Sequence, residues 1–461
     1  MAAKKVDEQT SKPSIATLPD TRVGNATFIP GGLGAVRGLR CAGVSAGFRR
    51  NPKRLDLALI VTEKPAVASG VFTRNTFCAA PVSVSRQNLA HEVMPPEQLE
   101  GPAAGSGARA IVLNSGNANA STGQPGWQTA LRTTQLAAAK LGCEPQQVLV
   151  ASTGVIGVPL GPDPFDSGLD LAIQQLGRAD GTHLDAGLHA AEAIMTTDTY
   201  AKQAAVQFEV GQGGGGAGSA GGGTEVTTYT IGGMVKGSGM IQPNMATLLG
   251  VFATDAWLTQ AAADAALRQA MDQTLNKVTV DSDTSTNDSV FFLSTGATPG
   301  STIEVGSLAF DAFVAAFTAL ATDLARQIAY DGEGATRLVT VNVTGAASNA
   351  QADAAGRSVA NSPLVKTAIA GHDANWGRIA MALGKSGAAF EQHRVSIAVM
   401  GIAVCAQGLP VPFDEAAALR GFEQNLEVVI DIDLGAGNGS ARLWTCDLTH
   451  GYISINGDYR T

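Results

Sequence analysis

The chain has 461 residues, of which 45% are hydrophobic and 5% aromatic, and its 31 basic and 40 acidic side chains give a net charge of −9. A chain of this length and composition can bury a core and contain two or three structural units. The acidic balance and the scarcity of aromatic side chains argue against a nucleic-acid partner, which calls for basic patches or stacking platforms.

The beginning of the chain predicts a mobile tail over residues 1–22, because this stretch is polar and has no apolar signal-peptide segment. No later stretch approaches the roughly 20 apolar residues of a membrane helix, so we expect a cytoplasmic protein without a membrane partner. The five cysteines lie far apart with no CxxC pair, which predicts reduced thiols, no disulfide framework and no metal site.

Strand and helix patterns alternate along the first half of the chain. They predict two strands about a Lys-Pro turn in residues 56–73, a strand at 108–113, a helix at 126–141, a strand at 147–151 and a helix at 184–195. Two glycine-containing loops, NSGNANASTG at 114–123 and STGVIG at 152–157, follow strands, and either alone is typical of a tight turn.

A glycine-rich segment at residues 211–224 separates two strand-like pieces and predicts a hairpin with a long loop. A phosphate-binding loop would need GxxxxGK[ST] or GxGxxG before a helix, and no helical pattern follows this segment. We therefore interpret it as an inert loop.

The second half continues the alternation and predicts a mixed α and β fold. The patterns predict helices at 258–276 and 309–330, and strands at 277–281, 289–296, 338–343, 395–399 and 426–432.

The junction at residues 232–256, GGMVKGSGMIQPNMATLLGVFATDA, joins a lysine-bearing glycine run, predicted to be flexible, to an apolar strand. Just before this strand stands a hydroxyl side chain, Thr247. None of the six histidines lies in a nucleophile-elbow or HExxH context, so a general base must come from elsewhere. An N-terminal threonine carries its own base, an α-amine with a pKa of about 7.7–8.0. On the residues alone, a threonine that begins a buried strand, such as Thr247, is usually just a β-branched strand residue.

The run KGSGMIQPNMATLLG resembles the self-cleavage signature of the ornithine acetyltransferase family, also called the glutamate N-acetyltransferase or ArgJ-type family, whose members serve arginine biosynthesis. Further blocks resemble this family in the family's order: NSGNANA at 114–120, STGVIG at 152–157, IMTTDTYAK at 194–202, VDSDTSTND at 280–288, DGEGAT at 331–336, HDANWGRI at 372–379 and the terminal INGDYRT.

The resemblance implies self-cleavage between Ala246 and Thr247, which gives an α chain of residues 23–246 after the tail and a β chain of residues 247–461. The two chains would fold as one unit. Thr247 would take an acetyl group from N-acetylornithine and pass it to glutamate by ping-pong transfer. The implied fold is a layered α/β sandwich with central β-sheets, like that of DmpA and ArgJ, with a smaller C-terminal domain.

The resemblance also implies roles for individual residues. The Thr153 hydroxyl and the Gly154 N–H would form an oxyanion hole. Substrate contacts would come from Thr196 or its neighbour Thr197, Lys236, Thr247, Glu333, Asn456 and Thr461. No cofactor is implied, although acetyl-coenzyme A could be a second donor, and the assembly would be a heterotetramer of two α and two β chains or a higher oligomer.

The sequence departs from the family pattern at two places. The loop at 211–224 is longer than the family's hairpin turn, and Ser282 stands where the family is expected to have glycine. Two other interpretations stay open at this point: a self-cleaving aminopeptidase, whose acyl acceptor is water, and a binding protein that keeps the fold without cleavage.

Overall fold

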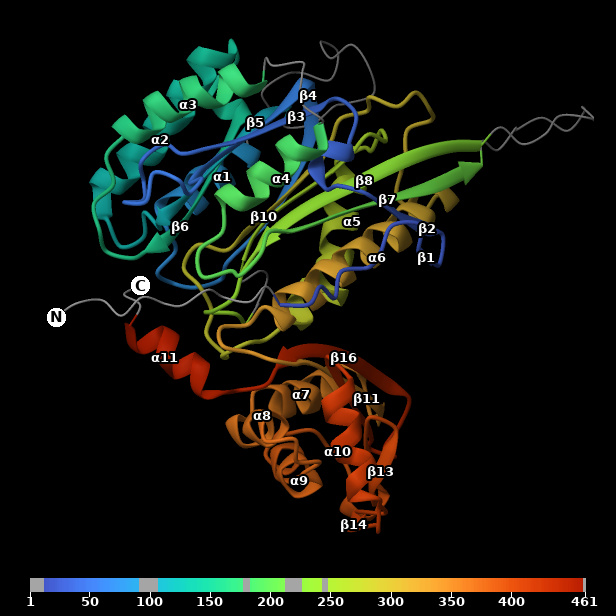
Figure 1. Cartoon of the computed structure of the whole chain (residues 1–461). Helices are drawn as coiled ribbons and strands as arrows, with labels where there is room; N and C mark the ends of the chain where they lie inside the picture. The colour runs from blue at the N-terminus through green and yellow to red at the C-terminus, as the bar shows by residue number, and fades with distance from the viewer. Residues whose placement is uncertain (1–11, 91–106, 177–182, 212–225, 243–247, 459–461) are drawn as a thin grey trace, which may run out of the picture.

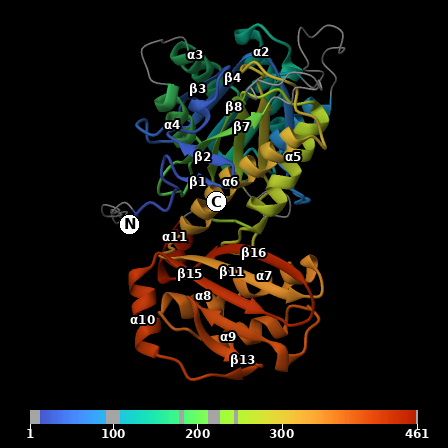
Figure 2. The same ribbon diagram turned by 90° about the vertical axis from the view of Figure 1, so that its right-hand side faces the viewer.

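The computed structural model describes residues 12–90, 107–176, 183–211, 226–242 and 248–458. It contains a large unit, with a small unit below it in Figures 1 and 2. The strands of the large unit are β1 Arg22–Val23, β2 Ala26–Ile29, β3 Leu39–Val44, β4 Leu57–Phe72, β5 Ala108–Asn117, β6 Val148–Val155, β7 Lys202–Gly211, β8 Val226–Lys236, β9 Leu249–Thr254 and β10 Ser289–Ser294. Its helices are α1 Ala80–Ala90, α2 Gly123–Leu141, α3 Asp163–Leu176, α4 His183–Ala193, α5 Gln260–Gln273 and α6 Leu308–Tyr330.

The long strand β4 joins two layers of the large unit. The strand order is β1-β2-β7-β8-β9-β10-β4-β5-β6, with β3 also paired to β4. The first part of β4 pairs with β3 and β5, whereas its last six residues pair with β10, and the register shifts between Val61 and Ala66. Because of this change of partner, β4 belongs to both layers.

A shared core shows that the two layers pack face to face. One buried cluster combines Ile60, Leu113 and Leu149 from the β4–β5–β6 side with Val251 and Phe291 from β9 and β10. Helices α5 and α6 cover the outer face of one layer, and α2 and α3 cover that of the other, through two further clusters. The expected α/β sandwich with central β-sheets is therefore confirmed.

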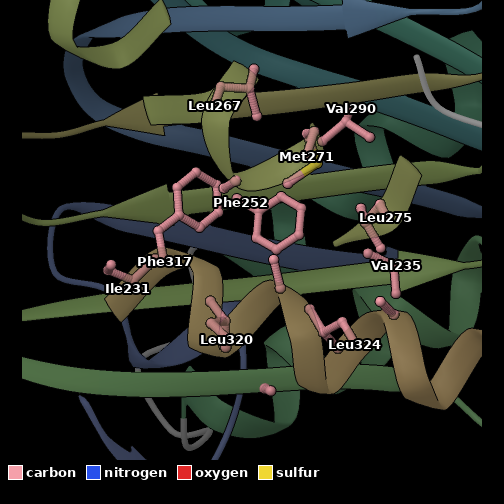
Figure 3. Close-up of a cluster of buried hydrophobic side chains, with 14 of the residues drawn as sticks. Ile231, Val235, Phe252, Leu267, Met271, Leu275, Val290, Phe317, Leu320 and Leu324 are labelled. Atoms are coloured by element: carbon pink, nitrogen blue, oxygen red, sulfur yellow. The ribbon is translucent and has the colours of Figure 1, made fainter. Parts of the chain in front are cut away.

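Helix α6 contributes more buried residues than any other element to the core on the outer face of the β7–β10 layer. It begins after Ser307, whose hydroxyl accepts the Phe310 N–H at 3.0 Å as an N-cap. Apolar side chains recur every three or four residues, and Phe317 packs on Phe252 with ring centroids 5.1 Å apart (Figure 3). By length and composition α6 could cross a membrane, with a mean hydropathy of 1.6, so the statement that no stretch is apolar enough was wrong. Its buried face identifies it as a core helix.

The small unit is built on a second sheet in the order β14-β13-β12-β15-β11-β16. Its strands are β11 Leu338–Ala346, β12 Ser396–Val399, β13 Ile402–Ala406, β14 Leu409–Pro410, β15 Glu427–Asp433 and β16 Gly439–Cys446. The remaining helices are α7 Asn349–Ala360, α8 Pro363–Ala370, α9 Trp376–Gly384, α10 Glu415–Gln424 and α11 His450–Asp458. Helices α7 to α10 pack on this sheet around one core, which confirms the smaller C-terminal domain.

Three local expectations were wrong. Residues 56–73 form one bent strand rather than two, because the Lys-Pro pair lies within the register shift. Residues 277–281 contain no strand, since a short 3-10 helix ends at Lys277. The glycine run was expected to be flexible, yet Gly232 and Gly233 lie inside β8. A Cβ on Gly232 would lie 2.3 Å from the carbonyl oxygen of Gly32, so this glycine allows close packing.

The predicted mobile tail also needs correction from Lys12 onward, because this segment lies along α6. The backbone N–H and hydroxyl of Thr17 donate to the Asp323 carboxylate at 2.7 and 2.6 Å, and Lys12 Nζ donates to the Tyr330 carbonyl at 3.2 Å. Residues 1–11 and the glycine-rich loop at 212–225 lie outside the described residues.

Replacement of Phe317 tests the core between α6 and β9. Phe317→Ala removes a fully buried ring, so we expect a loss of about 3–5 kcal/mol in the free energy of unfolding. Leu308→Ala on the same helix is the matched control, because Leu308 is 89% exposed, and it should cost less than about 0.5 kcal/mol. Urea denaturation of both variants measures the difference, and equal midpoints would contradict this packing.

Candidate active site

Six of the residues that the sequence nominated, together with Thr197 as the alternative to Thr196, line a single cavity of about 260 Å³. This volume is near the lower end of the ~300–1,000 Å³ typical of small-molecule sites. The six residues come from the end of β6, the segment after α4, the end of β8, the turn after α6, and α11: Thr153, Gly154, Thr196, Lys236, Glu333 and Asn456. The remaining nominated residues, Ala246, Thr247 and Thr461, lie outside the described residues.

The end of β6 requires a glycine. Gly154 has a φ of +132°, and a Cβ there would lie 2.4 Å from the Gly116 carbonyl carbon on the parallel neighbour β5. Next to it, the Thr153 hydroxyl accepts a hydrogen bond from Lys236 Nζ at 3.5 Å. Its own hydrogen is then directed elsewhere, so Thr153 can donate to a ligand in the cavity.

Lys236 is a buried cation at the end of β8. Lys236 is 8% exposed. Burial lowers the pKa of its ammonium group from 10.5, although the charge of Asp198 opposes this effect. Among the described residues, no carboxylate forms an ion pair with Lys236, and its ammonium group donates to the Thr153 hydroxyl. An ammonium group in this position suits an anionic group of a ligand.

A second buried lysine, Lys202, organises the segments behind the cavity. Lys202 Nζ lies 2.7 Å from Asp198 Oδ1 and 2.6 Å from Asp331 Oδ2, and all three side chains are fully buried. Burial alone would lower the pKa of Lys202, but the two carboxylates raise it above 10.5. Burial likewise opposes ionisation of Asp198, yet Lys202 and Lys236 hold its pKa below its ordinary value.

This network, which we call the Lys202 network, fixes the backbone of three cavity segments. Asp198 accepts the N–H groups of Thr196 at 2.9 Å and Gly237 at 2.8 Å. Asp331, two residues before Glu333, accepts the Thr199 N–H at 3.0 Å. The positions of Thr196, Lys236 and Glu333 therefore depend on one set of buried charges.

Glu333 places a carboxylate in the same cavity. Its N–H donates to the Ser238 carbonyl at 2.9 Å, and its Oε2 accepts from Asn456 Nδ2 at 2.7 Å. A Cβ on Gly239 would lie 2.4 Å from Glu333 Oε2, so the glycine run makes room for this carboxylate. The cavity thus contains both a cation and an anion for a ligand with charges of both signs.

Ten cavity residues were not singled out individually from the sequence, and five of them belong to the polar block at 281–288. The Asp281 carboxylate accepts the N–H groups of Met240 and Ile241 at 2.6 and 2.8 Å and the Tyr452 hydroxyl at 3.3 Å. Burial and the charge of Asp281 raise the pKa of Tyr452. Ser282, which replaces an expected glycine, has a φ of +67° and so keeps the left-handed turn that glycine favours.

The chain that follows Thr247 is held beside Lys236. Leu249 pairs with Lys236 on β8 and with Ser289 on β10, and the Ser289 N–H donates to the Leu248 carbonyl at 3.0 Å. The described residues that line the cavity include no histidine or cysteine. Within the described ranges, no group of three or more His, Cys, Asp or Glu residues could hold a metal ion.

The Lys202 network yields a stability prediction. Lys202→Met removes the buried cation that pairs with both Asp198 and Asp331, so we expect a loss of about 3–5 kcal/mol in the free energy of unfolding at pH 7. The pKa of Asp198 is depressed, so its contribution is present above pH 3.8 and disappears as the pH falls through the folded pKa. The difference in the free energy of unfolding between the wild type and Lys202→Met should therefore become smaller in acid.

Lys140→Met is the control for this prediction. Lys140 pairs with Asp166 and Asp170, whose side chains are 56% and 58% exposed. Its replacement should therefore lower the free energy of unfolding by less than about 1 kcal/mol. Denaturation curves at pH 7 and in acid measure both variants, and a Lys202→Met protein as stable as the control would refute the role of the network.

Known proteins resemble this chain over most of its length. A sequence model of the ArgJ family matches residues 40–461. A protein of Symbiobacterium thermophilum named "Arginine biosynthesis bifunctional protein ArgJ" is 45% identical over 94% of this chain and 100% of its own length. A protein of the same name from Thermosynechococcus vestitus is 41% identical over 94% of this chain and 99% of its own. A crystal structure of that protein from Bacillus halodurans is 40% identical, with a TM-score of 0.44, and covers 44% of this chain and 96% of its own. The chain belongs to the ArgJ family.

Proposed function

We propose that this protein is a glutamate N-acetyltransferase of arginine biosynthesis, which moves an acetyl group from N2-acetylornithine to glutamate through an ester on Thr247. One observation carries the proposal: the buried Lys236 ammonium has no carboxylate partner among the described residues and lies beside Thr153, in a cavity shared with Glu333. The relatives' names support the assignment to arginine biosynthesis.

The first chemical step is self-cleavage. Thr247 Oγ attacks the Ala246 carbonyl carbon, the C–N bond to Thr247 breaks, and the acyl group moves to oxygen as an ester. Water then hydrolyses the ester, which leaves a carboxylate on Ala246 and a free α-amine on Thr247. Strand β8 precedes this bond and β9 follows it, and residues 231–236 of β8 pair with residues 249–254 of β9, so chains 1–246 and 247–461 stay together after the cut.

The second step transfers the acetyl group. The α-amine of Thr247 accepts the hydroxyl proton as Oγ attacks the acetyl carbonyl carbon. The Thr153 hydroxyl and the Gly154 N–H stabilise the oxyanion, each such donor being worth about 3 kcal/mol. Ornithine leaves with the proton on its amine. The α-amine of glutamate then attacks the ester carbonyl carbon, the bond to Thr247 Oγ breaks, and the proton returns to Oγ.

Lys236 binds a carboxylate of either substrate, and Glu333 binds an ammonium group of the donor. Thr196 or Thr197, Asn456 and Thr461 complete the substrate contacts. The relatives are named bifunctional, which supports acetyl-coenzyme A as a second donor, used as a substrate and not as a bound cofactor. We further propose a cytoplasmic enzyme that assembles as two α and two β chains or as a higher oligomer.

Thr247→Ala tests the nucleophile. Without a hydroxyl group the acyl shift cannot start, so denaturing mass analysis should find one full-length chain, and acetyl transfer should fall to background. Thr247→Ser keeps the hydroxyl and should cleave and transfer. Normal processing of Thr247→Ala would eliminate Thr247 as the nucleophile. Release of free acetate without acetylglutamate by the cleaved wild type would indicate a hydrolase of the aminopeptidase kind.

The pH dependence tests Lys236. Only its ammonium form attracts a carboxylate, and burial lowers its pKa, so kcat/KM for N2-acetylornithine should begin to fall at a pH below 10.5. In Lys236→Arg, whose guanidinium stays charged, this alkaline fall should move to higher pH. With an uncharged aryl acetate as the acetyl donor, kcat/KM should not show this alkaline fall. The same alkaline fall in the wild type and in an active Lys236→Arg variant would refute the role of Lys236.

A further inference from the structure

The proposed reaction needs groups from two different sheet layers to meet. Thr153 and Gly154 lie near the end of β6, whereas Leu249 begins β9, the strand that follows Thr247 in the sequence. Strands β5, β4 and β10 lie between β6 and β9 in the sheet order. No strand pairing joins β6 to β9 directly. An oxyanion hole nevertheless works only when its donors lie about 2.7–3.1 Å from the oxyanion, so some other link must set this separation.

Asn287, which lines the cavity, supplies such a link. It is 5% exposed and stands two residues before Ser289, the first residue of β10. Its Nδ2 donates to the carbonyl oxygens of Ser152 at 2.9 Å and Ala118 at 2.5 Å, both of which belong to the opposite layer. Its Oδ1 accepts from the Thr286 hydroxyl at 2.6 Å.

These bonds hold the two strand ends that precede the cavity. The Ser152 carbonyl belongs to the same rigid peptide plane as the Thr153 N–H, so its orientation fixes the positions of the backbone nitrogen and Cα of Thr153. Ala118 follows β5, and its N–H donates to the Val155 carbonyl at 3.0 Å, so β5 and β6 are held together beyond Gly154. On the other side, the Ser289 N–H donates to the Leu248 carbonyl at 3.0 Å.

We propose that Asn287 is a positioning residue of the acetyl transfer: it ties the β6 end, with Thr153 and Gly154, to the layer that carries Thr247, and so sets the distance between oxyanion hole and nucleophile. This inference rests on the proposed function. Both N–H groups of Asn287 are already used, so it acts through Thr153 and Gly154 and does not bind the oxyanion. Aspartate would place a carboxylate against two carbonyl oxygens, and alanine would leave both without this donor.

Asn88 offers a matched control. It is 8% exposed, and its Nδ2 donates to the carbonyl oxygens of Val148 at 2.7 Å and Pro145 at 3.3 Å, at the start of β6. It therefore has the same chemistry as Asn287 at the opposite end of the same strand. Asn287→Ala and Asn88→Ala should lower stability to a similar extent, and only the first should alter catalysis.

The experiment measures steady-state acetyl transfer from N2-acetylornithine to glutamate, divided by the cleaved fraction of each protein. A misplacement of about 1 Å costs about 10²-fold in rate, so we expect kcat to fall about 10²-fold in Asn287→Ala, with KM within about threefold of wild type. Asn287→Gln keeps both N–H donors on a longer side chain, so its kcat should lie between that of Asn287→Ala and that of the wild type. Asn88→Ala should keep its kcat within about threefold.

Equal loss of kcat in Asn287→Ala and Asn88→Ala would overturn the inference, as would a rise in KM that accounts for the whole effect. Failure of both Asn287 variants to self-cleave, while Asn88→Ala cleaves normally, would also overturn it, because Asn287 would then serve processing. A wild-type protein that does not transfer acetyl groups would instead refute the proposed function.

Discussion

The candidate site depends on the buried ion network of Lys202 with Asp198 and Asp331. These charges join the end of β8, the segment after α4 and the turn after α6, which are far apart in the chain. A buried ammonium group is tolerated there because it donates to two carboxylates, which in turn accept backbone N–H groups. Loss of these ion pairs would release the backbone segments that position Thr196, Lys236 and Glu333 relative to one another.

The two buried lysines near the cavity show how one residue type serves two purposes. Lys202 has two carboxylate partners, and they raise its pKa despite its burial. Lys236 has no ion-pair partner among the described residues, and burial lowers its pKa. The first lysine has its counter-charges within the fold, whereas in the proposed function a ligand supplies the anion for the second.

The sequence predicted the elements that depend on local pattern. The apolar periodicity of α6 and the alternation of β7 and β8 come from neighbouring residues, and both are present in the structure. The bend of β4 and the function of Gly232 could not be predicted this way, because each depends on a partner elsewhere in the fold. The contact of Lys202 with Asp331 joins residues 129 positions apart, which no local pattern reports.

Family-like blocks nominated Thr153, Lys236 and Glu333, and the structure brings them into one cavity. The block at 280–288 contains Asn287 but gave it no individual role, and Tyr452 lies outside every block; both form hydrogen bonds between segments far apart in the chain.

The central claim is that Thr247 carries the acetyl group between the two substrates. The most direct test is to incubate the cleaved protein with N2-acetylornithine in the absence of glutamate, digest it and examine the peptide that begins at Thr247 by mass spectrometry. We predict that this peptide is heavier by one acetyl group and loses it when glutamate is added, with formation of acetylglutamate. A peptide that stays unmodified while the protein still transfers acetyl groups would contradict the account.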